Sequence, residues 1–302
     1  MSLEVTAGQR YYRTYTNGGS GPTGEADPAT VSTFRLDKYL VTVGRFRQFV
    51  SAWDGGAGYL PPAGSGKHTH LNKGFGLANS GRPGTYEAGW VDSDDGNIAP
   101  TDSNLTCGLI GAVLYDTWTS TVGGRENLPI NCVNWYEAYA FCIWDGGFLP
   151  SEAEWEYAAA GGSQQREYPW GSMDPGTNNE YAIFGHQTGA YELTTDCYYP
   201  SGEVCIGVSN IAPVGTATLG AGRWGQFDLA GDASEWNLDY YSADGRFIDP
   251  CTDCSYLTAA AARVLRGGDF ADDSLRLYPA SRGGDTPSDG YIYTSFRCAR
   301  SP

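Results

Sequence analysis

The stretch Leu149–Gly162, LPSEAEWEYAAAGG, predicts a short helix with a well-defined start. Ser151 followed three residues later by Glu154 is the pattern of a capping box, in which the serine accepts a hydrogen bond from the first turn and the glutamate reaches back to the cap. Alanines and aromatic residues then lead to Gly161-Gly162, and glycine is typical of a helix end. We expect the rest of the chain to fold on this helix and on its upstream neighbour.

The upstream neighbour is Trp135–Trp144, WYEAYAFCIW, which predicts a second helix ended by Gly146-Gly147. We expect these two helices to pack against each other. Other segments predict an edge strand at Arg10–Tyr15 followed by a loose stretch to residue 30, a strand at 31–39 from its alternating pattern, a helix at Val43–Trp53 and a long irregular region at 54–128.

Composition excludes some function classes. The chain has 302 residues with 42 glycines, 21 tyrosines, 9 tryptophans and only 18% charged residues, which favours a loop-rich single domain. The formal net charge of -16 argues against nucleic acid and anionic membranes as partners. No apolar run is long enough to span a bilayer.

Eight cysteines favour a disulfide set and therefore an extracellular or periplasmic protein. Met1 is followed by polar sequence rather than by an apolar signal segment, so we interpret the chain as a mature form. Cys251 and Cys254 form a C-x-x-C motif, for which a structural bond is favoured over zinc or redox chemistry because no second pair exists and acidic neighbours raise a thiol pKa.

Several motifs do not predict a site. Gly64–Thr69, GSGKHT, lacks the first glycine and the preceding strand of a phosphate loop. Asp92, Asp94, Asp95 and Asn97 are out of phase with a calcium loop and predict a solvated turn. His68 and His70 are expected at the surface, because a metal site needs further ligands and His186 is distant in sequence.

Five ordered motifs are similar to those of one known family. After the two helical segments come YPWG (Tyr168–Gly171), FDLAGDASEW (Phe227–Trp236), RVLRGGDF (Arg263–Phe270) and FRCAR (Phe296–Arg300). The chain therefore resembles the formylglycine-generating enzyme, or sulfatase-modifying factor, family. The resemblance implies an α+β fold, a variant of the C-type-lectin-like fold with little regular secondary structure, two packed helices and small antiparallel sheets, over residues 30–302 of a single domain.

The resemblance also implies a disulfide between Cys142 and Cys298, which ties the central helix to the C-terminal strand. By nearness in sequence we pair Cys197 with Cys205 and Cys251 with Cys254, which leaves Cys107 and Cys132. The family binds structural calcium at a loop that corresponds here to the Asp228 side chain, the Gly231 and Ala233 carbonyls and the Glu235 carboxylate. A second calcium site of the family falls near Ala182–Phe184, where Ile183 stands, so that site is not carried over.

The family's chemistry is expected to be absent. Its members oxidise a substrate cysteine with copper held by two cysteines, which would lie in the segment Ala271–Ser295. That segment has no cysteine; Asp272 and Ser274 stand near those positions, and Ala159 and Pro279 stand near a second cysteine pair of the family. We expect no copper, and a ligand groove lined by Asp272, Ser274, Arg276, Arg282, Asp285, Ser288, Tyr291 and Tyr293 beside Trp224 and Tyr240.

Three function classes follow from the resemblance. The first is an exported, calcium-stabilised binding or structural module whose ligand is a protein, peptide or saccharide. The second is an enzyme with different chemistry, such as the related non-haem-iron sulfoxide synthases, although their iron-binding histidines come from an additional N-terminal helical domain. The third is a retroelement-diversified lectin-like binding protein, which would vary the segment 269–295.

Overall fold

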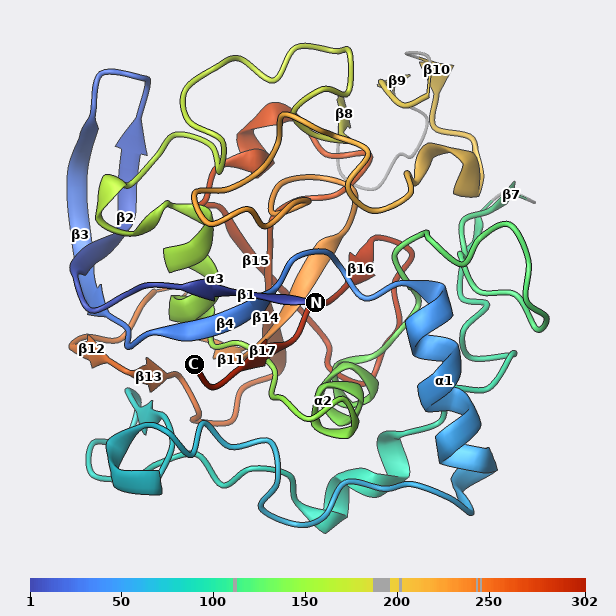
Figure 1. Cartoon of the computed structure of the whole chain (residues 1–302), viewed down its shortest axis with the longest axis horizontal. Helices are drawn as coiled ribbons and strands as arrows, with labels where there is room; N and C mark the ends of the chain where they lie inside the picture. The colour runs from blue at the N-terminus through green and yellow to red at the C-terminus, as the bar shows by residue number, and fades with distance from the viewer. Residues whose placement is uncertain (111–112, 187–195, 201–202, 243, 245) are drawn as a thin grey trace.

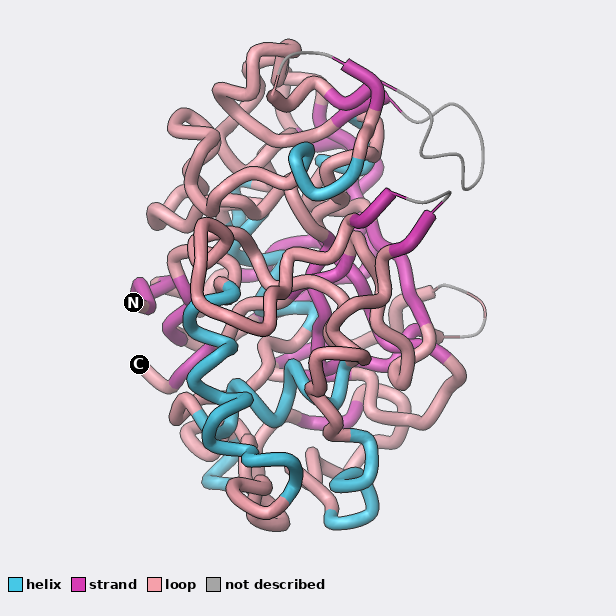
Figure 2. Tube along the Cα trace, turned by 90° about the vertical axis from the view of Figure 1, so that its right-hand side faces the viewer, coloured by secondary structure: helices cyan, strands magenta, loops and turns pink. Residues whose placement is uncertain are grey.

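Most of the chain lies in loops, which connect short helices and small sheets (Figures 1 and 2). The computed structural model describes residues 1–110, 113–186, 196–200, 203–242, 244 and 246–302. This is the α+β architecture expected from the sequence. In the described part of the chain, no helix is both long enough and apolar enough to cross a bilayer.

The three α-helices begin at capping residues that the sequence supplies. Thr42 caps α1, while Asn134 and Ser151 form capping boxes with the glutamates three residues on. The helices are α1 (Val43–Trp53), α2 (Trp135–Trp144) and α3 (Glu152–Ala159), as the sequence patterns predict. Single 3₁₀ turns are η1 (Asp54–Gly56), η2 (Asn72–Gly74), η3 (Asp92–Asn97), η4 (Gly162–Gln164), η5 (Gly207–Asn210) and η6 (Ser274–Leu277).

The largest described sheet has four strands in the order β15-β14-β11-β16. Strand β14 pairs antiparallel with β11 and β15, and β16 pairs parallel with β11. Its strands are β11 (Ser234–Tyr241), β14 (Ala262–Arg266), β15 (Arg282–Asp285) and β16 (Thr294–Ser295). In the part of the chain that is described, β15 forms one edge of this sheet.

Smaller sheets contain the strands near the two ends of the chain. The order β1-β4-β17 joins both termini to β4, and the order β12-β3-β2 packs at one side of the molecule (Figure 1). These strands are β1 (Ser2–Val5), β2 (Arg10–Asn17), β3 (Pro22–Thr30), β4 (Phe34–Asp37), β12 (Cys251–Thr252) and β17 (Ala299–Arg300). The remaining short strands are β5 (Ala78–Asn79), β6 (Leu109–Ile110), β7 (Val113–Leu114), β8 (Gly185–His186), β9 (Asp196–Cys197), β10 (Glu203–Val204) and β13 (Cys254–Ser255).

Two strand predictions need correction. The stretch expected to be loose contains β3, which pairs with β2 over much of its length. The strand expected at 31–39 is confined to β4, because Ser32 turns away from a sheet partner. Its N–H and its hydroxyl both donate to the Asp253 carboxylate, at 2.6 and 2.9 Å.

Helix α2 packs mainly against α1 rather than against α3. Phe141 of α2 lies 5.7 Å from Phe46 and 5.8 Å from Phe49, measured between ring centroids. Helix α3 instead contributes Trp155 and Tyr157 to a second buried cluster with residues of β1, β2 and β4. The two consecutive helices therefore contribute to two different hydrophobic clusters, and the cluster of α2 includes Trp236 and Leu265 of the large sheet.

Four disulfides connect these parts. They join Cys107 to Cys132, Cys142 to Cys298, Cys197 to Cys205 and Cys251 to Cys254, which are the pairs named from the sequence. The Cys142–Cys298 bond closes a separation of 156 residues between α2 and the C-terminal segment. Residues 201–202, inside the loop that Cys197 and Cys205 close, lie outside the described residues.

Helix α3 carries three buried carboxylates, and each has a cationic partner. Arg266 of β14 contacts Glu152 at 2.8 Å and Glu156 at 2.6 Å. Arg282 of β15 adds two hydrogen bonds to Glu152, at 2.7 and 2.8 Å. A charge buried without such a partner costs several kcal/mol, so these pairs fix the orientation of α3 on the sheet.

The third carboxylate, Glu154, is paired with His68, and the prediction that His68 is a surface residue is wrong. The His68 ring is fully buried, with Nε2 3.1 Å from Glu154 and Nδ1 3.1 Å from Glu87. Burial disfavours the imidazolium, but attraction by Glu154 and Glu87 outweighs it and raises the pKa of His68 to about 10. His68 is thus a structural cation that holds the start of α3.

This pairing predicts a specific pH dependence of stability. Because the folded-state pKa of His68 is raised above its usual value, its stabilisation is complete at low pH and is lost as pH rises towards about 10. In urea denaturation, the difference in unfolding free energy between wild type and His68→Gln should shrink between pH 7 and 10, by up to about 1.4 kcal/mol per pH unit. The exposed His186→Gln is the matched control and should show no such trend; a constant difference for His68→Gln would contradict the pairing.

Candidate functional site

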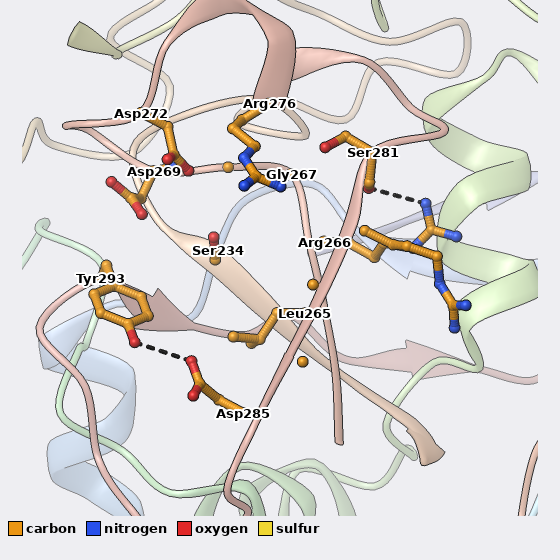
Figure 3. A pocket seen from close by; sticks show the side chains of 14 residues that line it. Ser234, Leu265, Arg266, Gly267, Asp269, Asp272, Arg276, Ser281, Asp285 and Tyr293 are labelled. Carbon is orange, nitrogen blue, oxygen red and sulfur yellow. Dashed lines mark hydrogen bonds between the residues drawn. The ribbon is translucent and has the colours of Figure 1, made fainter. Parts of the chain in front are cut away.

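A pocket of about 350 Å³ lies on one face of the large sheet (Figure 3). Ser234 of β11, Leu265 of β14 and Gly283 of β15 form its floor. The segment Gly267–Arg276 forms one wall, and Tyr293 with Asp285 forms another (Figure 3). The pocket therefore lies where RVLRGGDF leaves the sheet.

Glycines shape this pocket in two ways. Gly267 and Gly268 have φ angles of +98° and +71°, a conformation that other residues rarely adopt, and they turn the chain from β14 into the wall. Gly283 has an ordinary strand conformation, and a Cβ at this position would meet no atom within 4 Å. The missing side chain at Gly283 thus keeps the floor open.

The two arginines at the back of the pocket are already neutralised. Arg266 and Arg282 line it, but their guanidinium groups bind Glu152 and Glu156 of α3. Arg266 also donates to the carbonyls of Pro279 and Ser281, at 2.7 and 3.1 Å. These contacts position the chain on both sides of the pocket and leave little free positive charge there.

Acidic side chains dominate the walls. Asp269 Oδ1 accepts a hydrogen bond from the Ala271 N–H at 2.9 Å, and Asp272 Oδ2 accepts one from the Asp269 N–H at 3.2 Å. Burial, together with their mutual repulsion, raises the pKa of Asp269 well above its usual value, and burial raises that of Asp272. On the facing wall, Asp285 accepts a hydrogen bond from the Tyr293 hydroxyl at 2.9 Å, and burial raises the Asp285 pKa.

The structure gathers part of the groove expected from the sequence. Asp272, Arg276, Arg282, Asp285 and Tyr293 line the pocket together. Other expected residues lie outside the lining. Ser274 begins η6, Tyr291 stacks behind Tyr293 at 5.2 Å, Ser288 is exposed and bonds to Asp289, Trp224 stacks on Tyr157 at 5.6 Å, and Tyr240 lies beneath Arg263 at 3.4 Å.

Sequence reasoning missed the floor and one acid of the wall. The sequence signal for Asp269 is its place at the end of the RGGD motif. The signal for Ser234 is its place directly before Glu235, at the start of a strand. Leu265 and Ser281 carry no local signal, because only the pairing of β14 with β15 brings them to the pocket.

Comparison with known proteins identifies the family. The profile of the "Sulfatase-modifying factor enzyme 1-like domain" matches residues 2–302. A formylglycine-generating enzyme from Thermomonospora curvata is 31% identical over 96% of this chain and 91% of that protein. The chain belongs to the formylglycine-generating enzyme family.

Other relatives cover less of the chain or show the fold alone. The "Inactive C-alpha-formylglycine-generating enzyme 2" of Mus musculus is 32% identical over 60% of this chain and 52% of its own length. Among solved structures, PvdO from Pseudomonas aeruginosa aligns over all of this chain and 92% of its own, with a TM-score of 0.53 and 20% identity. Treponema denticola variable protein 1 covers all of this chain and 95% of its own, with a TM-score of 0.53 and 16% identity.

The pocket does not fit the family's copper chemistry. Copper(I) is selected by soft thiolate ligands, and the pocket is lined by none. All eight cysteines of the chain are described, and all are joined in disulfides. Hard carboxylate oxygens from Asp269 and Asp272 stand on the pocket wall instead.

The loop expected to bind calcium is arranged differently from the ligand set that the resemblance implies. Both Glu235 oxygens bind Arg297, at 2.6 and 2.8 Å, and Arg297 also donates to the Asp228 carbonyl at 2.9 Å. The Gly231 carbonyl accepts the Ala233 N–H at 2.9 Å. Near Ala182–Phe184, the Ile183 carbonyl accepts the Asp232 N–H at 2.7 Å. A guanidinium therefore already occupies the Glu235 side of this loop.

A cation fits better between Asp228 and Asp232. Both carboxylates are buried, Asp232 Oδ2 has no hydrogen-bond partner in the described residues, and Asp228 Oδ2 holds the Gly215 N–H at 2.8 Å. Burial and the charge of Asp228 raise the pKa of Asp232 well above its usual value. Carboxylate oxygens are among the ligands that calcium prefers, so these two side chains are the best candidates to hold it.

Calcium on this loop stays a prediction, with a direct test. Calcium at 1 mM should raise the melting temperature of wild type measured in EDTA-treated buffer, because a ligand that binds the native state alone stabilises it. Asp232→Asn should remove most of that rise while folding normally. The control Asp244→Asn, at an exposed residue, should retain it; an equal response in both variants would place calcium elsewhere.

Proposed function

We propose that this chain is an exported ligand-binding member of the family that does not generate formylglycine. The observation that carries the proposal is the content of the pocket: three aspartates, three arginines of which two are paired to carboxylates of α3, and no thiol. With every cysteine in a disulfide, no thiolate pair is available for copper or for the substrate's sulfur. A scaffold that keeps a shaped pocket without its reactive groups is suited to binding.

Two further points support the proposal. One relative is named an inactive formylglycine-generating enzyme, so loss of the activity has a parallel within the family. Four disulfides are typical of oxidising compartments outside the cytosol, which supports export.

An enzyme with different chemistry is the second candidate, favoured by one observation. Asp269 and Asp272 are a pair of interacting carboxyl groups with raised pKa values, and such pairs serve acid–base catalysis in other proteins. A relative named hercynine oxygenase, from Mycobacterium tuberculosis, is 31% identical over 57% of this chain. An iron site of histidines is disfavoured, because His68 is held on both ring nitrogens by Glu87 and Glu154.

The proposal predicts that the protein makes no aldehyde. The purified protein, loaded with copper(I) and given a cysteine-containing sulfatase-type peptide, should leave the peptide thiol intact by mass spectrometry. The Thermomonospora curvata relative, assayed in parallel, is the positive control. Titration of the denatured, unreduced protein should find no free thiol. Formation of formylglycine would overturn the proposal.

A further inference from the structure

The charges around the pocket do not balance. Its lining holds three aspartates (Asp269, Asp272 and Asp285) and three arginines (Arg266, Arg276 and Arg282). Arg266 is bound by Glu152 and Glu156 of α3, and Arg282 is bound by Glu152. Arg276 is exposed, and its guanidinium forms no ion pair with the described residues. Three carboxyl groups therefore face one arginine that is not ion-paired to α3, Arg276, whose charge acts on Asp272.

Asp269 and Asp272 are the centre of this imbalance. Backbone N–H groups orient one oxygen of each, and burial together with the charge of Asp272 raises the pKa of Asp269. Two carboxylates this close cannot both be ionised comfortably unless a proton or another cation lies between them. The pair is thus an acceptor for a positively charged group.

An independent feature of the floor points to a ligand at the same place. Ser234 is 8% exposed, and its hydroxyl makes no hydrogen bond to any described residue. Figure 3 shows this hydroxyl directed from β11 towards the space below Asp269 and Arg276. The Ser234 side chain lines the pocket, so its hydroxyl can hydrogen-bond a polar group of the ligand. Beside it, Gly283 leaves the floor open.

The donor set fits an organic cation better than a metal ion. Among the described residues, the group of three acidic, histidine or cysteine ligand atoms within 4.8 Å of one another is Asp37, Asp145 and Cys298, away from this pocket. The pocket's acceptors are instead spread around a volume of about 350 Å³. An ammonium group has three hydrogens that can reach separate acceptors, and Leu265 and Tyr293 offer apolar surface for the rest of a ligand.

We propose that the pocket binds a small organic cation through a primary ammonium group, which Asp269 and Asp272 accept from the wall and Ser234 accepts from the floor. Asp285, held by Tyr293, adds negative charge from the facing wall. This inference rests on the proposed binding function, because it names the chemical class of ligand that the same pocket takes.

The test compares two probes that differ in one charge. Nα-acetyl-lysine amide and Nα-acetyl-norleucine amide are titrated into the full chain at pH 7 and followed by chemical-shift perturbation or calorimetry. We expect the lysine probe to bind at least about tenfold more tightly than the norleucine probe. Asp272→Asn should remove that preference, whereas Asp273→Asn, a neighbour outside the lining with the same charge change, should keep it.

Filling the pocket gives a second, separate readout. Gly283→Phe should abolish lysine-probe binding without backbone strain, while Gly124→Phe, at another open and exposed glycine, should not. Equal binding of both probes, or no binding of the lysine probe at 10 mM, would overturn the inference. Stoichiometric displacement of the lysine probe by magnesium or calcium in both wild type and Asp232→Asn would also overturn it, in favour of a metal site. Failure of the proposed function is distinct, since that would appear as formylglycine formation.

Discussion

The structure depends on neutralising three negative charges that one eight-residue helix buries. Glu152, Glu154 and Glu156 of α3 are all shielded from water, and each contacts a cation from a distant segment. One oxygen of Glu156 has no partner among the described residues, and burial raises the pKa of Glu156 to about 8. Removing one partner of a buried ion pair typically costs about 3–5 kcal/mol, because the other charge is left stranded. The helix can therefore occupy one position on the sheet, the one in which Arg266, Arg282 and His68 all reach it.

That constraint also decides the chemistry of the pocket. The guanidinium groups of Arg266 and Arg282 are bound by carboxylates of α3. The aspartates that line the pocket therefore have little opposing positive charge. The same pairs hold the two strands in register, so the pocket is preorganised rather than shaped by its ligand. Copper(I) prefers soft sulfur ligands, whereas this pocket offers hard carboxylate oxygens.

The sequence predicts local structure well because the signals are local. The capping boxes at Asn134 and Ser151 define two helices, and the ordered motifs identify the fold. The errors arise from contacts between distant residues. His68 is separated from Glu87 by 19 residues and from Glu154 by 86, and β3 gains its strand conformation from β2 and β12. The candidate site follows the same rule: Asp272, Asp285 and Tyr293 were recognisable from their segment, whereas the floor depends on strand pairing.

The segment Phe296–Ala299 joins several parts of the core. Phe296, Arg297, Cys298 and Ala299 are fully buried, and Arg297 neutralises Glu235 in the core. A polypeptide without these residues lacks the partner of Glu235, the second half of the long-range disulfide and the strand that pairs with β4. The native core therefore depends on a short segment that supplies a buried cation, a cysteine and a strand at the same time.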